Sequence, residues 1–174
     1  MEAGPPDEMK GGWPDYGQPP FEAWLTHRRQ TSETNVLAAI PPSRQVRVAT
    51  YVLAEPGVDP EAAHAYLAQF AETRNWRVHS TLFTERPAAS IAPPRDMRRP
   101  ELTRACGTVR RGVVDSILTT NYQALPPNST SYEHLLGQLD LWRAFIAFLP
   151  PGWLQQPPLL LHPPHPIATP KGTA

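Results

Sequence analysis

"VRVATYVLAEPG", residues 46–57, begins the part of the chain with the clearest pattern of secondary structure. Its first nine residues are rich in β-branched and aromatic side chains, which is typical of a mostly buried strand. In many α/β enzymes the end of such a strand carries a nucleophile or a phosphate-binding loop. Here the strand runs into Glu55, Pro56 and Gly57, which makes this end the first candidate for a functional site.

Outward from this stretch, strand-like and helix-like patterns alternate. The first predicted helix has Asp59 as its N-cap and Pro60 at its first position, and the third has Thr130 and Glu133 at capping-box spacing. The patterns predict strands at 46–54, 77–85, 113–120 and 146–149 and helices at 59–76, 99–112 and 130–145. We therefore predict an α/β fold, with a small, mainly parallel sheet and helices on both of its faces.

Proline divides the chain into three parts. Of the 23 prolines, 15 lie outside residues 46–149, and proline fits neither a helix interior nor a central strand. We expect 1–45 to be a mostly irregular Pro-rich arm, with a short helix at 21–30, and 46–149 to be the α/β domain. Residues 150–174 are expected to form an extended Pro-rich tail with polyproline II character.

The composition excludes several classes of protein. Lys plus Arg equals Asp plus Glu at 16 each, so no net charge attracts nucleic acid or membrane to the whole molecule. The single cysteine, Cys106, allows neither an internal disulfide nor a Cys-based zinc site. No apolar run approaches the roughly 20 residues that span a bilayer, and the N-terminus does not resemble a secretory signal. We expect a cytoplasmic protein with no membrane contact, no metal and no cofactor.

Three phrases of the central segment resemble the N-terminal catalytic domain of the serine recombinases, the resolvase and invertase family. The phrase "YVLAE" (51–55) is similar to the end of the family's first strand. A second phrase, "RRPELTRACGTVRRGVVDSILTT" (98–120), is similar to its Arg-Pro-x-Leu helix and the following strand with Asp. The third, "QALPPNSTSYEHLLGQLDLW" (123–142), stands where the family has an Asp-Arg-Leu-Ser-Arg loop and a Leu-rich helix. The resemblance covers about residues 46–149.

The groups that perform the family's chemistry are missing from this sequence. The resemblance implies a serine that attacks a DNA phosphodiester and arginines that surround the phosphate. The positions that it assigns to these groups hold Leu53, Glu55, Gln123, Ala124 and Pro127. Only the arginine before the second helix is kept, as Arg99, with Arg98 beside it. A carboxylate at the nucleophile position repels a phosphate, so we expect no catalytic residue.

The assembly that the family uses is also absent. The resemblance implies a long helix after the fourth strand, which forms the dimer interface and leads to a DNA-binding module. The phrase "PPGW" (150–153) stops such a helix at its start. We therefore expect no helix-turn-helix in the residues that follow it in this sequence.

A run of arginines around the second helix is the candidate phosphate-binding surface. It consists of Arg95, Arg98, Arg99, Arg104, Arg110 and Arg111. Only Asp96 and Glu101 oppose these charges, which favours contact with phosphates. Helical spacing scatters the same residues around the axis, which is equally typical of a solvated helix surface.

The other polar candidates have structural interpretations. His162 and His165 are separated by two prolines and have no acidic or Cys neighbour, so we expect no metal there. The sequon "NST" (128–130) has no use in a cytoplasmic protein. We expect His64 to lie at the surface or boundary of its helix, and Ser116 to pack inside a strand.

The C-terminal tail is a candidate for partner binding. Trp153 and the phrase "PLLLHPP" (158–164) suit an aromatic-lined groove of another protein. A linker, or a strip packed on its own domain, fits the same composition.

Three hypotheses of function follow. The first is a catalytically inactive serine-recombinase-like domain that acts as a binding or regulatory module for a protein partner. The second is a recombinase relative that still handles DNA through the Arg95–Arg111 face. The third is an unrelated flavodoxin-like domain, although the sequence has no Gly-rich loop and no phosphate-binding Lys.

Overall fold

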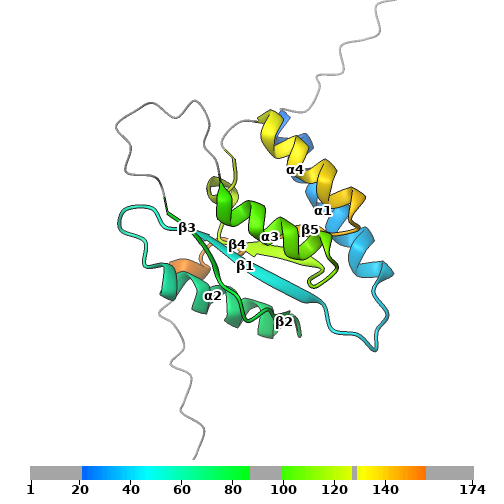
Figure 1. Cartoon of the computed structure of the whole chain (residues 1–174), viewed down its shortest axis with the longest axis horizontal. Helices are drawn as coiled ribbons and strands as arrows, with labels where there is room; N and C mark the ends of the chain where they lie inside the picture. The colour runs from blue at the N-terminus through cyan, green and yellow to red at the C-terminus, as the bar shows by residue number, and fades with distance from the viewer. Residues whose placement is uncertain (1–20, 87–98, 127–128, 156–174) are drawn as a thin grey trace, which may run out of the picture.

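The computed structural model describes residues 21–86, 99–126 and 129–155 (Figure 1). Its sheet has the strand order β2-β1-β4-β5, and β3 also pairs with β1. The strands are β1 (Arg47–Leu53), β2 (Arg77–Val78), β3 (Phe83–Glu85), β4 (Ser116–Thr119) and β5 (Phe145–Phe148). All of the pairings are parallel, which confirms the predicted α/β fold with a parallel sheet.

Helices follow the strands as parallel pairing requires. The described helices are α1 (Phe21–Ala39), α2 (Pro60–Thr73), α3 (Pro100–Arg110) and α4 (Ser129–Leu141), with short 3₁₀ turns at Tyr122–Ala124 and Trp153–Gln155. Asp59 caps α2 as predicted, because its side chain accepts a hydrogen bond from the backbone N–H of Glu61. Helix α4 ends earlier than predicted, since Arg143 adopts a left-handed conformation (φ 52°) immediately before β5.

The predicted strand 77–85 is two short strands in the structure. Strand β2 pairs with the beginning of β1 and β3 with its end, so together they form one interrupted edge. The interruption has a local cause. The Nδ1 atom of His79 accepts a hydrogen bond from the backbone N–H of Thr81 at 3.1 Å, which takes this N–H out of the β ladder.

Two apolar cores lie on the two faces of the sheet. One core joins α3 and α4 to residues such as Tyr51 and Ile117. The other joins α2 to Val48 and Val52. Helices therefore cover both faces, as predicted (Figure 1).

Helix α1 corrects the expectation of an irregular arm over 1–45. It has 19 residues, whereas the sequence predicted only a short helix at 21–30. The reason is that residues 21–40 contain no proline, although the arm as a whole is rich in it. The helix lies along β5, and it contributes Leu25 to one core and Val36 to the edge of the other.

The beginning of the predicted tail is folded as well. Trp153 packs edge-to-face on Phe70 of α2, with ring centroids 5.4 Å apart. The expectations for 1–20 and 156–174 lie outside the described residues. In the part of the chain that the structure describes, no helix has the length and apolar character that crossing a bilayer requires.

Candidate functional site

The carboxyl end of β1 is the natural ligand position in this sheet. The chain first builds β2 and β3 on one side of β1 and then returns to build β4 on the other side. Ligands of open α/β sheets bind where the connections diverge in this way. The sequence had placed the catalytic positions of the resembled family at the same end.

The end of β1 carries no nucleophile. Leu53 is half-buried and packs against the core between the sheet and α3. Glu55 is exposed in a turn, which is closed by a hydrogen bond from the N–H of Val58 to the carbonyl of Glu55 at 3.0 Å. Gly57 has φ +85° in this turn, a conformation that side chains with a Cβ rarely adopt.

Arg99 is present at this end, but its guanidinium points into the protein. Nη1 donates to the hydroxyl of Tyr51 at 3.3 Å and to the carbonyl of Ala124 at 3.2 Å, and Nη2 donates to the carbonyl of Leu125 at 3.5 Å. Burial raises the pKa of Tyr51 to about 12, against the opposing effect of Arg99. Arg99 thus joins β1 to the turn after β4, and its guanidinium is bonded to groups of the protein and not directed toward a ligand.

A second group, Glu85, occupies the position where an anion would bind. Its Oε2 atom accepts hydrogen bonds from the N–H groups of Glu101 at 3.0 Å and Leu102 at 3.4 Å, in the first turn of α3. These groups and the helix dipole favour anions. Arg99, the N-cap residue, gives no side-chain cap, so Glu85 from β3 replaces it. Glu85 is only 5% exposed, and no pattern in the sequence indicated this role.

The remaining catalytic positions contribute no reactive group. Gln123 is exposed in the 3₁₀ turn after β4, and Ala124 is buried beside it. Pro127, Arg95 and Arg98 lie outside the described residues.

Two other candidates for a nucleophile are also in inert surroundings. Ser116 is fully buried and donates to the carbonyl of Ile117 at 3.3 Å, so its predicted packing role is confirmed. Burial raises the pKa of the Cys106 thiol to about 11, which makes it a poor nucleophile.

His64 is buried rather than at the surface, so the expectation for it was wrong. Its Nδ1 shares a hydrogen bond of 2.9 Å with the hydroxyl of Thr50, and its Nε2 shares one of 2.9 Å with the hydroxyl of Thr84. Desolvation by burial lowers the pKa of His64 below its ordinary value of 6.5. The ring connects α2 to two strands, with both nitrogens in use.

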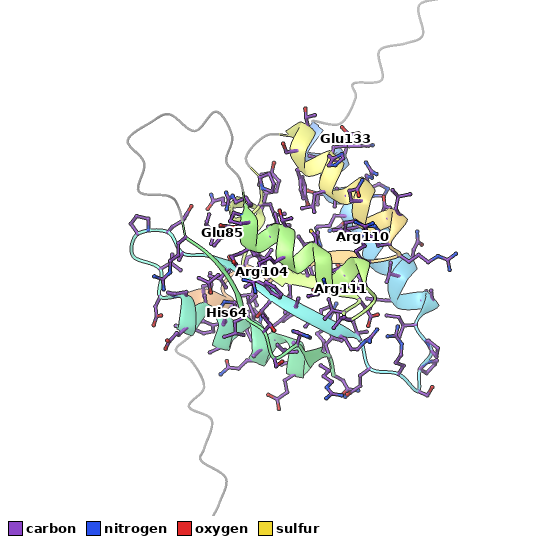
Figure 2. All side chains as sticks on the ribbon, in the orientation of Figure 1. His64, Glu85, Arg104, Arg110, Arg111 and Glu133 are labelled. Atoms are coloured by element: carbon purple, nitrogen blue, oxygen red, sulfur yellow. The ribbon has the colours of Figure 1, made fainter. Side chains whose placement is uncertain are left out.

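The arginines of α3 do not act as one surface. Arg99 donates hydrogen bonds to groups inside the domain. Arg104 and Arg110 of α3 and the C-cap residue Arg111 are exposed (Figure 2). Arg104 makes two hydrogen bonds, of 2.9 and 3.0 Å, with the carboxylate of Glu101.

An open cleft of about 480 Å³ lies between α3 and the β2–β3 segment. Its walls include Arg104 and Arg111 from α3 and His79 and Phe83 from the strand segment. A second cleft, of about 300 Å³, adjoins it and includes Arg77. His79 and Arg77 were not among the residues that the sequence patterns indicated. The helical spacing of Arg104 and Arg111, seven residues apart, is the signal that could have indicated a shared face.

Among the described residues, no group of three or more His, Cys, Asp or Glu side chains could hold a metal ion. Comparisons of the chain with protein-family models, with curated proteins and with solved structures found no match. The resemblance to the serine recombinases rests on the three sequence phrases given above.

Proposed function

We propose that the domain is a non-catalytic, serine-recombinase-like module that binds or regulates a partner. The observation that carries this proposal is the carboxylate of Glu85 on the first turn of α3. A phosphate at the end of β1 would have to displace this buried group or lie against its negative charge.

The state of Arg99 supports the same proposal. The family's phosphodiester exchange passes through a covalent phosphoserine, whereas the nucleophile position holds Glu55, whose negative charge repels a phosphate. The exchange also needs several cations around one phosphate. The guanidinium of Arg99 is engaged by Tyr51 and by two backbone carbonyls. Leu53 and Ala124 supply no charge in the other described positions.

The partner that we propose is a protein, contacted in part by the Pro-rich tail beyond residue 155. A cytoplasmic location suits the free thiol of Cys106.

A second candidate is DNA handling through the arginines of α3. The exposed side chains of Arg104, Arg110 and Arg111 favour it. In this candidate the arginines hold the phosphate backbone without cleaving it.

A plasmid assay tests the absence of catalysis. Wild type and Glu55→Ser are incubated with supercoiled plasmid, and the reaction is stopped with denaturant. We expect neither nicked or relaxed DNA nor a protein–DNA adduct from either protein, because the serine alone restores no cation. An adduct from the wild type would overturn the proposal. An adduct from Glu55→Ser alone would show that more cations reach the phosphate than the structure places there.

A further inference from the structure

We propose that the groove between α3 and the β2–β3 segment binds a linear chain of phosphate groups. This inference goes beyond the proposed protein partner and rests on the second candidate, in which exposed arginines hold phosphates without cleaving them. The groove consists of the two adjoining clefts, which share His79 and Val113. It is distinct from the end of β1, where the family's chemistry would be expected.

The groove is lined by cations from three elements. Arg104 belongs to α3, and Arg111 is the C-cap residue of the same helix. Arg77 begins β2 and Arg47 begins β1. These residues are distant in the sequence, and the parallel pairing of Arg47 with Arg77 brings the last two together.

Acidic side chains neutralise only part of this charge. Glu101 pairs with Arg104, and Asp115 pairs with Arg47. Asp115 is shared with Arg44, at 3.0 Å, so it does not fully compensate either arginine. Arg77 and Arg111 have no acidic partner within the described ranges. The groove therefore has a local positive charge, although the whole chain has none.

His79 adds a hydrogen-bond donor at the junction of the two clefts. Because its Nδ1 accepts the hydrogen bond from the backbone N–H of Thr81, Nε2 is the ring nitrogen that is left to donate. This N–H is the atom that can donate to a phosphate oxygen between the arginines of α3 and those of the strands.

The spacing of the cations favours a chain of phosphates over a single one. Arg104 and Arg111 are seven residues apart on the helix, which corresponds to about 10 Å along its axis. The second cleft extends the line of cationic side chains from Arg111 toward Arg77. Phe83 is the one Phe, Tyr or Trp side chain among the lining residues and is only 1% exposed. The lining therefore offers no exposed Phe, Tyr or Trp ring on which bases could stack, which favours recognition of phosphates over base sequence.

Gly107 keeps the floor of the first cleft open. A Cβ added at this position would lie 3.8 Å from the Nη1 atom of Arg111, which is an ordinary contact. The Cβ of a substituted residue therefore meets no clash here, and we use Gly107→Glu to bring a negative charge close to Arg111. Glutamate is also a better helix former than glycine.

Two neighbouring arginines provide a matched test. Arg111 lines the groove, whereas Arg110 is exposed on the same helix end and is not among the lining residues. Arg111→Glu and Arg110→Glu change the net charge equally and have similar effects on the helix dipole. Binding of fluorescent long-chain polyphosphate and of labelled oligothymidylate is measured by anisotropy at low and moderate salt.

We expect wild type to bind polyphosphate, with an affinity that falls as salt rises. Arg111→Glu should weaken binding about tenfold, as should Gly107→Glu, whereas Arg110→Glu should change it by less than about twofold. Binding of oligothymidylate with the same dependence on Arg111 would extend the ligand to nucleic acid. Binding of polyphosphate alone would identify a free phosphate chain as the source. Circular dichroism confirms that each variant is folded.

Three results would overturn the inference. They are no binding of either probe by the wild type, equal losses in the Arg110 and Arg111 variants, and equally tight binding of polyglutamate. The plasmid assay is independent of these outcomes, because an absence of cleavage is compatible with a groove that fails to bind.

Discussion

Glu85 of β3 and Glu101 of α3 are joined by a hydrogen bond of 3.0 Å, in which the Glu85 carboxylate accepts from the Glu101 backbone N–H. The N-terminus of α3 is thereby capped by a side chain of β3, and 14 residues separate the end of this strand from the start of the helix. Both residues are acidic, yet the contact is favourable because the positive end of the helix dipole lies at this N–H.

Removing this cap should destabilise the protein. Glu85→Ala leaves two N–H groups of α3 without their acceptor, and we expect a loss of about 1–3 kcal/mol in the free energy of unfolding. Glu85→Gln keeps an acceptor and should lose less. Urea denaturation of the two variants measures the difference. Equal stability of Glu85→Ala and wild type would contradict this account of the cap.

Asp115 should make stability depend on acidic pH. Burial alone would raise its pKa, but hydrogen bonds from the side chain and backbone of Arg47 and from Arg44 hold it below its ordinary value of 3.8. Since the pKa of Asp115 is depressed in the folded protein, its ionised carboxylate contributes fully to the free energy of unfolding above about pH 4. This contribution is lost as pH falls through the folded pKa. We expect Asp115→Asn to lose about 1–2 kcal/mol at pH 7 and to approach wild type in strong acid. A difference that persists unchanged at the lowest pH would contradict this linkage.

His64 should make the stability of the protein depend on pH in a higher range than Asp115 does. Because burial lowers its pKa in the folded protein, the unfolded chain binds a proton first as pH falls below 6.5. Stability should therefore be complete above this pH and decrease below it. His64→Gln removes this titration, so its deficit relative to wild type should shrink between pH 7 and 5. Chemical denaturation at several pH values measures this deficit, and a constant value would disprove the assignment.

Replacement by alanine should change the stability of the protein in opposite directions at two glycines. Gly137 lies within α4, where a Cβ would meet the guanidinium of Arg28 at an ordinary 3.7 Å. Gly137→Ala should stabilise the protein by about 1 kcal/mol. Gly112 has φ +69° after α3, so Gly112→Ala should cost about 1 kcal/mol. Thermal unfolding of both variants is the measurement, and shifts in the same direction would count against the backbone assignment.

Two buried threonines offer a similar contrast. The hydroxyl of Thr119 has no hydrogen-bond partner among the described residues, whereas that of Thr50 bonds to His64. Valine keeps the shape of both side chains. Thr119→Val should therefore stabilise the protein by about 1 kcal/mol, and Thr50→Val should destabilise it by a similar amount. Loss of stability in Thr119→Val would indicate that its hydroxyl has a partner.

The parallel sheet was predictable because its signals are local. The β-branched run at β1 and the Asp59-Pro60 start of α2 each specify an element within a few residues. Helix α1 was missed because proline was counted over the whole arm, while the window between Pro20 and Pro41 is free of it.

The features of the candidate site depend on contacts that the sequence order hides. Glu85 reaches the start of α3 only because β3 ends beside it, and Arg99 turns inward only because Tyr51 and two carbonyls meet there. The split between β2 and β3 depends on one imidazole, that of His79. No periodicity of hydrophobic residues encodes such polar contacts.

The position of α1 along β5 has a consequence for synthesis of the chain. The guanidinium of Arg29 donates to the carbonyl of Ile146 at 3.4 Å, across a separation of 117 residues. At a translation rate of roughly 5–20 residues per second, Arg29 is synthesised roughly 6–23 seconds before Ile146 of β5. During that interval Leu25, which is 1% exposed in the folded protein, has no core to enter. The nascent chain must therefore keep the apolar side chain of Leu25 uncovered until β5 emerges, and transiently exposed apolar surface of this kind favours aggregation during translation.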